Sequence, residues 1–466
     1  MRDTKYRIET LCLYDYRGVE EHLSAMAAQG WRLEKAGNTL WKYRRAEPSS
    51  LRYAVTYHDG ASQFNPGPTQ GQQSLEELCA DAGWQKVCDW FQAQIFSTDN
   101  PTAVPLETDE ALRLENIHRS MRKNFLPSSI ILLSICLLMS SSFLYSLISG
   151  KIFRLFESNA HLFSGTMFLL VAVLEIYTLF HYYRWRKNSR RSLADGGSCV
   201  PLGPGYRCLN RAMLVLAAIL AFLYLLLELY GGGRGRALFF LLYISLLVLL
   251  VFLVRRTTAL LRRLKASKNV NIAGTLIVDV ILAFALTSSL AYGIIRCGWF
   301  LGDGREETYE YQGKEWDVSP RDDLPLTLAE LTGEDYAHVR RRVFNQGSFF
   351  LPQRTYYEAA LSGSSSSVWL DYTIWEPKFP RLQEAVLEEF LKTAGCSGPR
   401  YGAAYCYIPE SPDPWGADAA YRRHIDGAPL NTWLLSWPGR VIVVSLKEPP
   451  SEMQQSLLGV RLGPEV

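Results

Sequence analysis

Three acidic side chains, Glu175, Glu228 and Asp279, interrupt long apolar stretches in the middle of the sequence, and Glu228 lies near the end of its stretch, within reach of lipid headgroups. Glu175 and Asp279 each lie inside a run long enough to cross a bilayer, and His181 follows Glu175 by less than two helical turns. A charge at bilayer depth is costly, so such residues often mark a path for ions or substrates. Hydrogen bonding between helices is the alternative role for the same side chains. Both roles require helices that span a membrane.

The other groups of reactive side chains follow no known catalytic or ligand spacing. His424 and Asp426 do not match a zinc or calcium pattern. His338 stands beside arginines at positions 340–342, on a segment that we expect to be helical. This basic patch would bind an anion or a lipid headgroup, or it would simply face solvent. Phosphate-binding loops, zinc-protease motifs and nucleophile elbows are missing from the sequence, so we expect no enzyme activity, no cofactor and no bound metal.

Two cysteines near the C-terminal end form a candidate disulfide. The chain contains nine cysteines, and Cys396 and Cys406 lie ten residues apart. They would form a bridge if this part of the chain faces an oxidising compartment. The alternative is that both stay unpaired. The spacing of the cysteines gives no metal-ligand pattern.

Five apolar segments reach the length of about 20 residues that a helix needs to cross ~30 Å of hydrocarbon. Each must be helical, because lipid offers no hydrogen-bond partner to the backbone. We therefore expect a five-helix transmembrane bundle at residues 126–298, preceded by a basic connector at 106–125. The expected helices are Leu126–Ser149, Leu162–Tyr183, Ala212–Tyr230, Ala237–Val254 and Gly274–Cys297.

Basic residues alternate along the connections between these segments. Lys and Arg are frequent before the first segment, between the second and third, and between the fourth and fifth. The other connections contain few, namely Lys151 and Arg154 in one and Arg234 and Arg236 in the next. The positive-inside rule then predicts a cytoplasmic N-terminus and an extracytoplasmic C-terminal domain. The lipid bilayer is an expected partner, whereas a net charge of only +3 does not suggest nucleic acid.

An internal repeat occupies residues 5–98. The sequences MAAQGW and CADAGW end two amphipathic helices, Val19–Ala28 and Leu75–Ala82. Glycine favours the left-handed conformation that ends a helix, and the tryptophan then packs back from the next strand. We expect a duplicated β-α-β-β domain of the α+β class at residues 1–105, with both helices on one face of an antiparallel sheet. Its strands are expected at Tyr6–Tyr14, Arg32–Ala36, Thr39–Arg44, Leu51–Tyr57, Gln85–Asp89 and Phe91–Ser97.

Three segments of this region resemble the bacterial domain-of-unknown-function family 2812. They read LSAMAAQGWRLEK, RYAVTYHDG and LEELCADAGWQKV. The resemblance implies a cytoplasmic α+β domain followed by membrane helices in a bacterial membrane. The family has no agreed activity that would carry over to this chain.

Residues 303–466 predict a second α+β domain. Serine-rich residues 362–367 and the pair Pro438-Gly439 each connect two β-rich segments, as hairpin turns do. The expected strands are Thr355–Leu361, Val368–Trp375, Asn431–Trp437 and Arg440–Leu446, and the expected helices are Pro380–Ala394 and Pro449–Leu458.

The organisation of the chain favours a non-enzymatic sensor or regulatory protein that couples an outer domain to a cytoplasmic domain. A signal would pass as a helix shift to a protein partner. The alternative is a transporter, or a subunit of one, that uses Glu175 and Asp279. Against it, the segments show no inverted repeat and no broken helices. A membrane enzyme acting on an envelope substrate is the third interpretation, and no group of residues supports it. The sequence identifies no small-molecule ligand.

Overall fold

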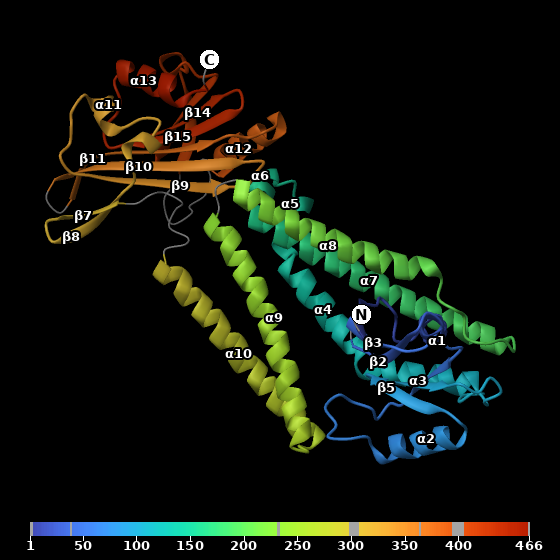
Figure 1. Ribbon diagram of the computed structural model, residues 1–466. Helices are drawn as coiled ribbons and strands as arrows, with labels where there is room; N and C mark the ends of the chain where they lie inside the picture. The colour runs from blue at the N-terminus through green and yellow to red at the C-terminus, as the bar shows by residue number, and fades with distance from the viewer. Residues whose placement is uncertain are drawn as a thin grey trace. The chain divides into compact units, whose positions relative to one another are not determined.

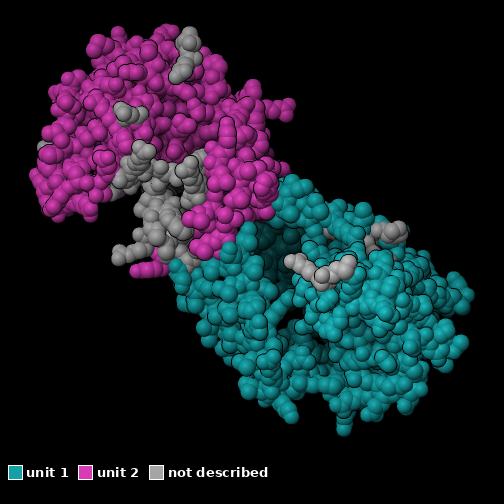
Figure 2. Space-filling model, viewed as in Figure 1, with its two compact units in different colours: residues 1–139, 167–220, 243–289 teal, residues 140–166, 221–242, 290–466 magenta. Residues whose placement is uncertain are grey.

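The computed structural model describes residues 3–37, 40–230, 234–297, 307–362, 365–393 and 405–464. Figure 1 shows the elements along the chain, and Figure 2 colours two compact units separately. Unit 1 contains residues 1–139, 167–220 and 243–289, and unit 2 contains residues 140–166, 221–242 and 290–466. Four long helices each contribute residues to both units: α7 (Asn159–Ala194), α8 (Pro204–Tyr230), α9 (Arg234–Arg263) and α10 (Lys268–Cys297).

The N-terminal domain confirms the duplicated β-α-β-β pattern. The first repeat is β1 (Thr4–Ile8), α1 (Tyr16–Ala28), β2 (Trp31–Lys35) and β3 (Leu40–Arg45). The second is β4 (Arg52–Tyr57), α2 (Gln70–Asp81), β5 (Gln85–Trp90) and β6 (Ala93–Thr98). The expected single sheet is wrong, because each repeat forms its own antiparallel sheet, with orders β1-β3-β2 and β4-β6-β5. Pairing stays within each repeat since the short hairpin between its last two strands brings them together first.

The start of the first repeat differs from the predicted strand. The strand was expected to reach Tyr14, but it ends at Ile8. The backbone amide of Asp15 donates to the carbonyl of Cys12, and the Asp15 carboxylate accepts from the amide of Gly18. These bonds form a turn and an N-cap, which favour the start of α1 over a longer strand.

The glycine–tryptophan pairs act as the repeat predicted. Gly30 and Gly83 have φ values of +81° and +83°, which is the left-handed conformation that ends α1 and α2. Trp84 is buried, and its indole Nε1 donates to the carbonyl of Val104. Trp41 is fully buried within the core of the domain. Most of the aromatic residues of this domain therefore serve its packing.

Five helices are long and apolar enough to cross a membrane, as the sequence predicted. They are Glu110–Met139, Asn159–Ala194, Arg211–Tyr230, Ala237–Arg263 and Lys268–Ser289. Many large apolar side chains on them are exposed, such as Phe222, Val248 and Phe284. Such an outer surface suits contact with lipid and would not suit water.

The first membrane helix differs from its predicted limits. It consists of α3 (Glu110–Lys123) and α4 (Phe125–Met139), and the apolar run then breaks at Ser140. The short helices α5 (Ser141–Ile148) and α6 (Ile152–Phe156) follow before α7 begins. Serines cluster at the break, and their hydroxyls compete for backbone hydrogen bonds. Gly150, with φ of +65°, allows the turn between α5 and α6.

The C-terminal domain contains a nine-stranded sheet with the order β12-β13-β14-β15-β11-β10-β9-β8-β7. The predicted hairpins and helices are confirmed as β10/β11, β14/β15, α12 and α13. The strands are β7 (Glu307–Tyr311), β8 (Lys314–Val318), β9 (Val339–Gly347), β10 (Pro352–Ser362), β11 (Ser365–Trp375), β12 (Tyr405–Glu410), β13 (Ala419–Ile425), β14 (Ala428–Trp437) and β15 (Arg440–Leu446). The α-helices are α11 (Leu328–Thr332), α12 (Pro380–Thr393) and α13 (Glu452–Leu462).

Helices cover both faces of this sheet. Trp433 and Leu435 pack on one side with residues of α11 and α13. Leu434, which lies between them, packs on the other side with α12. This alternation follows the two-residue period of a strand. Phe153 and Phe156 of α6 join the same cluster as α12, so the connection after the first membrane helix is part of the core of unit 2.

Candidate functional site

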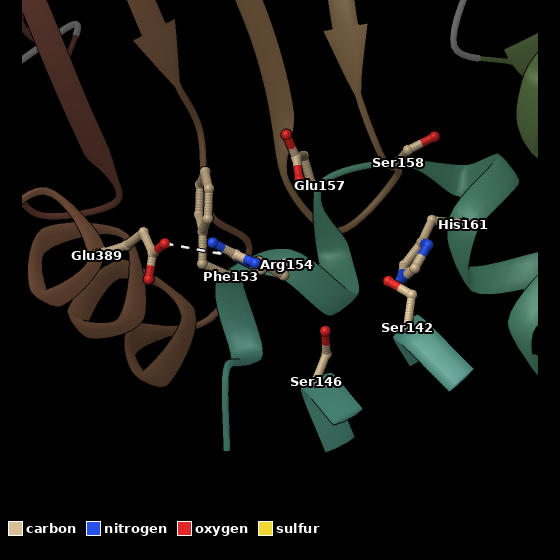
Figure 3. Close-up of a pocket in the computed structure, with 8 residues that line it drawn as sticks. All are labelled: Ser142, Ser146, Phe153, Arg154, Glu157, Ser158, His161 and Glu389. Atoms are coloured by element: carbon tan, nitrogen blue, oxygen red, sulfur yellow. Dashed lines mark ion pairs between the residues drawn. The ribbon is translucent and has the colours of Figure 1, made fainter. Parts of the chain in front are cut away.

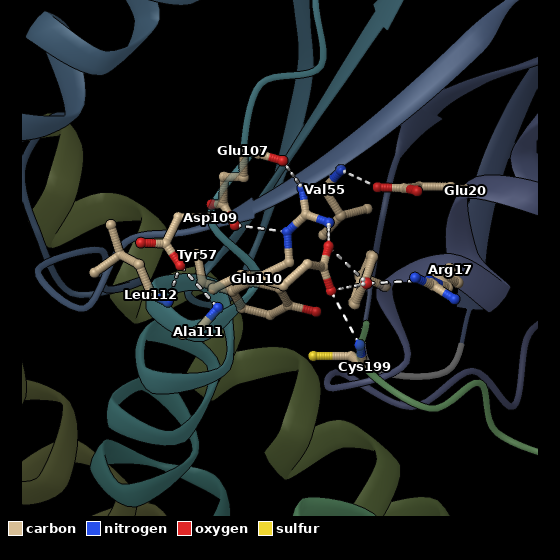
Figure 4. A network of polar contacts seen from close by, with 12 residues as sticks. Arg17, Glu20, Val55, Tyr57, Glu107, Asp109, Glu110, Ala111, Leu112 and Cys199 are labelled. Atoms are coloured by element: carbon tan, nitrogen blue, oxygen red, sulfur yellow. Dashed lines mark hydrogen bonds and ion pairs between the residues drawn. The ribbon is translucent and has the colours of Figure 1, made fainter. Parts of the chain in front are cut away.

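A partly buried network of charged and polar groups joins the N-terminal domain to the ends of two membrane helices in unit 1. Arg113, near the start of α3, pairs with two carboxylates, Glu107 and Glu110, which Figure 4 labels. Its Nε lies 2.8 Å from Glu107 Oε2, and its Nη1 lies 2.7 Å from Glu110 Oε1. Its Nη2 also donates to the Glu107 carbonyl at 2.9 Å. Charge-assisted bonds of this kind fix the geometry of both partners.

Glu110 extends the network to two other parts of the chain. The hydroxyl of Tyr16, the first residue of α1, donates to Glu110 Oε2 at 3.0 Å. The backbone amide of Cys199, in the connection between α7 and α8, donates to the same oxygen at 3.1 Å. The Arg113 guanidinium lies 4.6 Å from the centre of the Tyr16 ring. We call these five residues the Arg113 network: Tyr16, Glu107, Glu110, Arg113 and Cys199.

The connection that carries Cys199 is folded back on α7 by local hydrogen bonds. Trp185 Nε1 donates to the Val200 carbonyl at 2.8 Å, and the Val200 amide donates to Ser189 Oγ at 3.1 Å. Trp185 also packs against Tyr14, with ring centres 5.0 Å apart. The N-terminal domain is thus bound to the end of α7 by aromatic packing as well as by the Arg113 network.

A third carboxylate, that of Glu20 in α1, lies beside the network. Glu20 Oε1 accepts a hydrogen bond from the Val55 amide of β4 at 2.9 Å. Burial raises the pKa of Glu20 to about 7, and the bond from Val55 and the charges of Arg113 and Arg17 only partly oppose this shift. Burial also raises the pKa of Glu107. Two acidic groups near Arg113 therefore bind protons more readily than exposed glutamates do.

The same domain contacts the facing ends of α9 and α10. Arg262 Nε donates to the Asn65 carbonyl at 3.0 Å, and Asn271 Nδ2 donates to the Phe64 carbonyl at 2.9 Å. Asn271 is fully buried. The loop between β4 and α2, which carries Phe64 and Asn65, therefore attaches the domain to another pair of membrane helices.

The intramembrane acids lie apart from this network. Glu175, on α7, has the Ser129 hydroxyl of α4 within hydrogen-bonding reach, and its Oε2 makes no hydrogen bond within the described part of the chain. Asp279 Oδ1, on α10, is also buried without one. Among the described residues, no hydrogen bond or ion pair joins Glu175 to Asp279. The His181 ring packs on Tyr177, with ring centres 4.3 Å apart.

The other residues that the sequence analysis singled out lie outside the Arg113 network. Cys406 lies half-buried on β12, and Cys396 lies outside the described residues, so their pairing stays a prediction. The segment at 340–342 is strand β9, and the expected helix there is wrong. In a strand successive side chains face opposite sides, so the basic patch divides. Arg341 pairs with buried Glu358 at 2.6 Å, while the Arg340 guanidinium lies 5.6 Å from the Trp316 ring.

Metal binding finds no support in the part of the chain that the structure describes. No group of three or more His, Cys, Asp or Glu side chains there has the arrangement of a metal site. His424 Nδ1 lies 3.1 Å from the carbonyl of Arg422, which satisfies one ring nitrogen locally.

The Arg113 network escaped the sequence analysis. Its signal was the acid-rich segment LETDEALRLE directly before the first membrane helix. Arg113 is one of the basic residues before the first apolar segment, which the sequence analysis used only to predict the orientation in the membrane. Its i,i+3 spacing from Glu110 and the capping position of Asp109 were the available clues. No sequence pattern indicates that Tyr16 and Cys199 would meet at this point.

Residues 15–129 match the model of a family described as a protein of unknown function, DUF2812. This match confirms the resemblance in the N-terminal region. The DUF2812 match begins at the N-cap of α1 and ends within α4, so it contains four of the five contributors to the network: Tyr16, Glu107, Glu110 and Arg113. No curated protein and no solved structure matches the chain.

Proposed function

We propose that this membrane protein is a non-enzymatic sensor or regulator that couples an extracytoplasmic C-terminal domain to its cytoplasmic DUF2812 domain. The observation that carries this proposal is the Arg113 network. Through Glu110, it ties α1 of the N-terminal domain both to α3 and to the connection after α7. A shift of either membrane helix would strain charge-assisted bonds inside the domain, and such discrete contacts suit a two-state switch.

The proposed location is a bacterial cell membrane with the N-terminus in the cytoplasm. Two features support this orientation. The parts of the chain that contact the N-terminal domain in unit 1 lie at the end of α7 with the connection after it, and at the facing ends of α9 and α10. The ends of α7 and α9 in these parts are rich in Arg and Lys. The connection that joins the core of the C-terminal domain in unit 2, through α6, contains few basic residues. The positive-inside rule assigns the first group to the cytoplasm.

Cysteine labelling tests the orientation. Leu78 in the N-terminal domain and Met453 in the C-terminal domain are 67% and 82% exposed, so Leu78→Cys and Met453→Cys give accessible thiols. Both would be made in a chain whose exposed Cys208 is replaced by Ser. We expect a membrane-impermeant thiol reagent to label Met453→Cys in intact cells and Leu78→Cys only in opened cells. The same labelling of both in intact cells would contradict the topology.

Hydrogen exchange of the full chain in lipid nanodiscs tests the coupling. Phe156→Ala would loosen α6 at its contacts with Phe350 and Phe379, whose ring centres lie 5.4 and 5.8 Å away. The proposal expects faster amide exchange in α1 of the N-terminal domain as a result. Val460→Ala, on an exposed site of α13, is the control and should leave α1 unchanged. Unchanged exchange of α1 in Phe156→Ala, with local loosening around α12, would overturn the coupling.

A transporter, or a subunit of one, is the alternative proposal. It is favoured by the carboxylate oxygens of Glu175 and Asp279 that make no hydrogen bond among the described residues. Such groups would be available to a transported cation or proton. Glu175→Gln and Asp279→Asn together should then abolish flux into proteoliposomes. Flux that persists in the double variant would remove this alternative.

A further inference from the structure

A polar pocket lies in unit 2 where the chain turns back after the first membrane helix. Its volume is about 480 Å³, which is in the range of small-molecule sites. Helices α5, α6 and α12 and the start of α7 surround it (Figure 3). The lining residues are Ser142, Ser146, Phe153, Arg154, Glu157, Ser158, His161 and Glu389.

The lining carries both signs of charge, and the charged groups of Arg154 and Glu157 can accept further interactions. Arg154 Nε lies 3.7 Å from Glu389 Oε1, which is too long for a hydrogen bond. Figure 3 shows Arg154 between Glu389 on one side and His161 on the other. Glu157 is exposed, and within the described ranges it makes no ion pair or hydrogen bond. The guanidinium has five donors in a fixed fork, so most of them remain available to a ligand.

This balance of charge selects the class of ligand. A purely anionic ligand would meet two carboxylates, and a purely cationic one would meet Arg154. A ligand with both charges satisfies the lining, with its anion at Arg154 and the Ser142 hydroxyl and its ammonium at Glu157. Serine, charged and histidine side chains make up seven of the eight lining residues.

The surroundings of the pocket indicate where such a ligand comes from. Helix α5 directly follows the break at the end of α4, and it exposes Leu147 and Ile148. On the same helix Tyr145 is exposed, and Lys151 Nζ lies 4.8 Å from the centre of its ring. Exposed apolar residues beside Tyr and Lys are typical of the boundary between membrane and water. Phospholipid headgroups occupy that boundary.

We propose that this pocket binds a zwitterionic headgroup that carries a phosphate and a primary ammonium, as in phosphatidylethanolamine. The phosphate lies at Arg154 and the hydroxyl-bearing side of the pocket, and the ammonium lies at Glu157. Binding at this pocket requires no signal between the two soluble domains, so it can hold even if the proposed coupling fails. The free form of the same chemistry is O-phosphoethanolamine.

The first experiment measures lipid binding. It uses native mass spectrometry of the full chain, with lipid added to the delipidated protein. We expect phosphatidylethanolamine to bind about tenfold more tightly than phosphatidylglycerol, which lacks the ammonium. Arg154→Gln and Glu157→Gln should each remove this preference. Arg119→Gln and Glu115→Gln are matched controls, because these side chains form an exposed ion pair in unit 1. They should leave the preference unchanged.

The second experiment measures binding of the soluble compound. It uses calorimetry of the delipidated protein with O-phosphoethanolamine. Preferred binding of phosphatidylethanolamine, with or without binding of O-phosphoethanolamine, assigns the pocket to a lipid headgroup. Binding of the soluble compound without any lipid preference assigns it to the free zwitterion, provided that Arg154→Gln abolishes it. Equal affinity for the two lipids together with no binding of the soluble compound would overturn the proposal. Binding that survives both pocket variants would overturn it as well.

Discussion

The two soluble domains are bound to the membrane helices by different chemistry. In unit 1 the N-terminal domain is held by a partly buried ionic network at Arg113 together with aromatic packing at Trp185. In unit 2 the C-terminal domain is held mainly by apolar packing, in which Phe156 of α6 lies against Phe350 and Phe379. Apolar contacts tolerate small displacements, whereas buried ionic networks hold only in one geometry. The contrast makes unit 1 the place where a helix shift would be felt most sharply.

The largest effect should come from removing the central cation of unit 1. Arg113→Met leaves Glu107 and Glu110 without their cationic partner in a partly buried site. We expect the free energy of unfolding of the N-terminal domain to fall by about 3 kcal/mol, the lower end of the cost of breaking a buried ion pair, because water partly reaches the site. Hydrogen exchange of amides in α1, measured in nanodiscs, reports this change.

Two further variants sharpen this prediction. Arg119→Met removes an exposed i,i+4 partner of Glu115 and should change stability by less than ~1 kcal/mol. Replacing Glu107 and Glu110 by Gln in the Arg113→Met background should restore part of the loss, because no unpaired charge then remains. Equal effects of Arg113→Met and Arg119→Met would show that the network contributes no more than a surface pair.

The second prediction concerns the pH dependence of the N-terminal domain of unit 1. Burial raises the pKa of Glu20 to about 7 in the folded domain, well above the ordinary value of 4.5. Its contribution to stability is therefore complete below about pH 4.5 and is lost as the pH rises toward 7. The N-terminal domain should lose up to ~3 kcal/mol between pH 5 and pH 8.

Glu20→Gln checks the source of this pH dependence. The amide oxygen still accepts the hydrogen bond from Val55, but the side chain no longer ionises. The slope of stability against pH should flatten, with a remainder from Glu107, whose pKa is raised in the same direction. Glu115→Gln, at an exposed site, should leave the slope unchanged. A slope that is identical in Glu20→Gln and wild type would contradict the assignment.

The third prediction tests the apolar attachment of unit 2. Phe156→Ala removes ring contacts with Phe350 and Phe379, and we expect exchange in α12 to report a loss of about 2 kcal/mol. Phe156→Leu should recover about half of this loss, because it restores volume without specific geometry. If Phe156→Leu is as damaging as Phe156→Ala, the attachment of unit 2 depends on ring geometry, and the contrast with unit 1 weakens.

Sequence patterns predicted the elements of both domains well where the signal was local. The pairs Gly30-Trp31 and Gly83-Trp84 fixed the ends of α1 and α2, and Pro438-Gly439 fixed a hairpin. The number of sheets in the N-terminal domain was mispredicted, because local alternation does not show which strands of the two repeats pair. The run at Leu126–Ser149 was mispredicted as one helix, since hydropathy averages over the serines that break it at Ser140.

The candidate site was less predictable than the fold. Glu175 and Asp279 are conspicuous in a sequence because they interrupt apolar runs. The Arg113 network joins Tyr16, Glu110 and Cys199, which are far apart in the chain, so only the folded structure brings them together. The basic segment at 340–342 was misassigned to a helix, because charged residues in a mixed strand show no clear period.

The smallest effect should come from the exposed contact between α3 and the loop after β4. Lys123 Nζ lies 3.1 Å from Asp59 Oδ2 and also donates to the Asp59 carbonyl, and this hydrogen bond holds the pKa of Asp59 below its usual value. The contribution is therefore present at neutral pH and lost as Asp59 becomes protonated in acid. Lys123→Gln should cost about 0.2–1 kcal/mol, and the loss should shrink as salt rises from about 0.01 M to about 1 M. A larger, salt-independent loss would mean that the rim of unit 1 is as shielded from water as the Arg113 network, and the ionic attachment would then extend across the whole face of the domain.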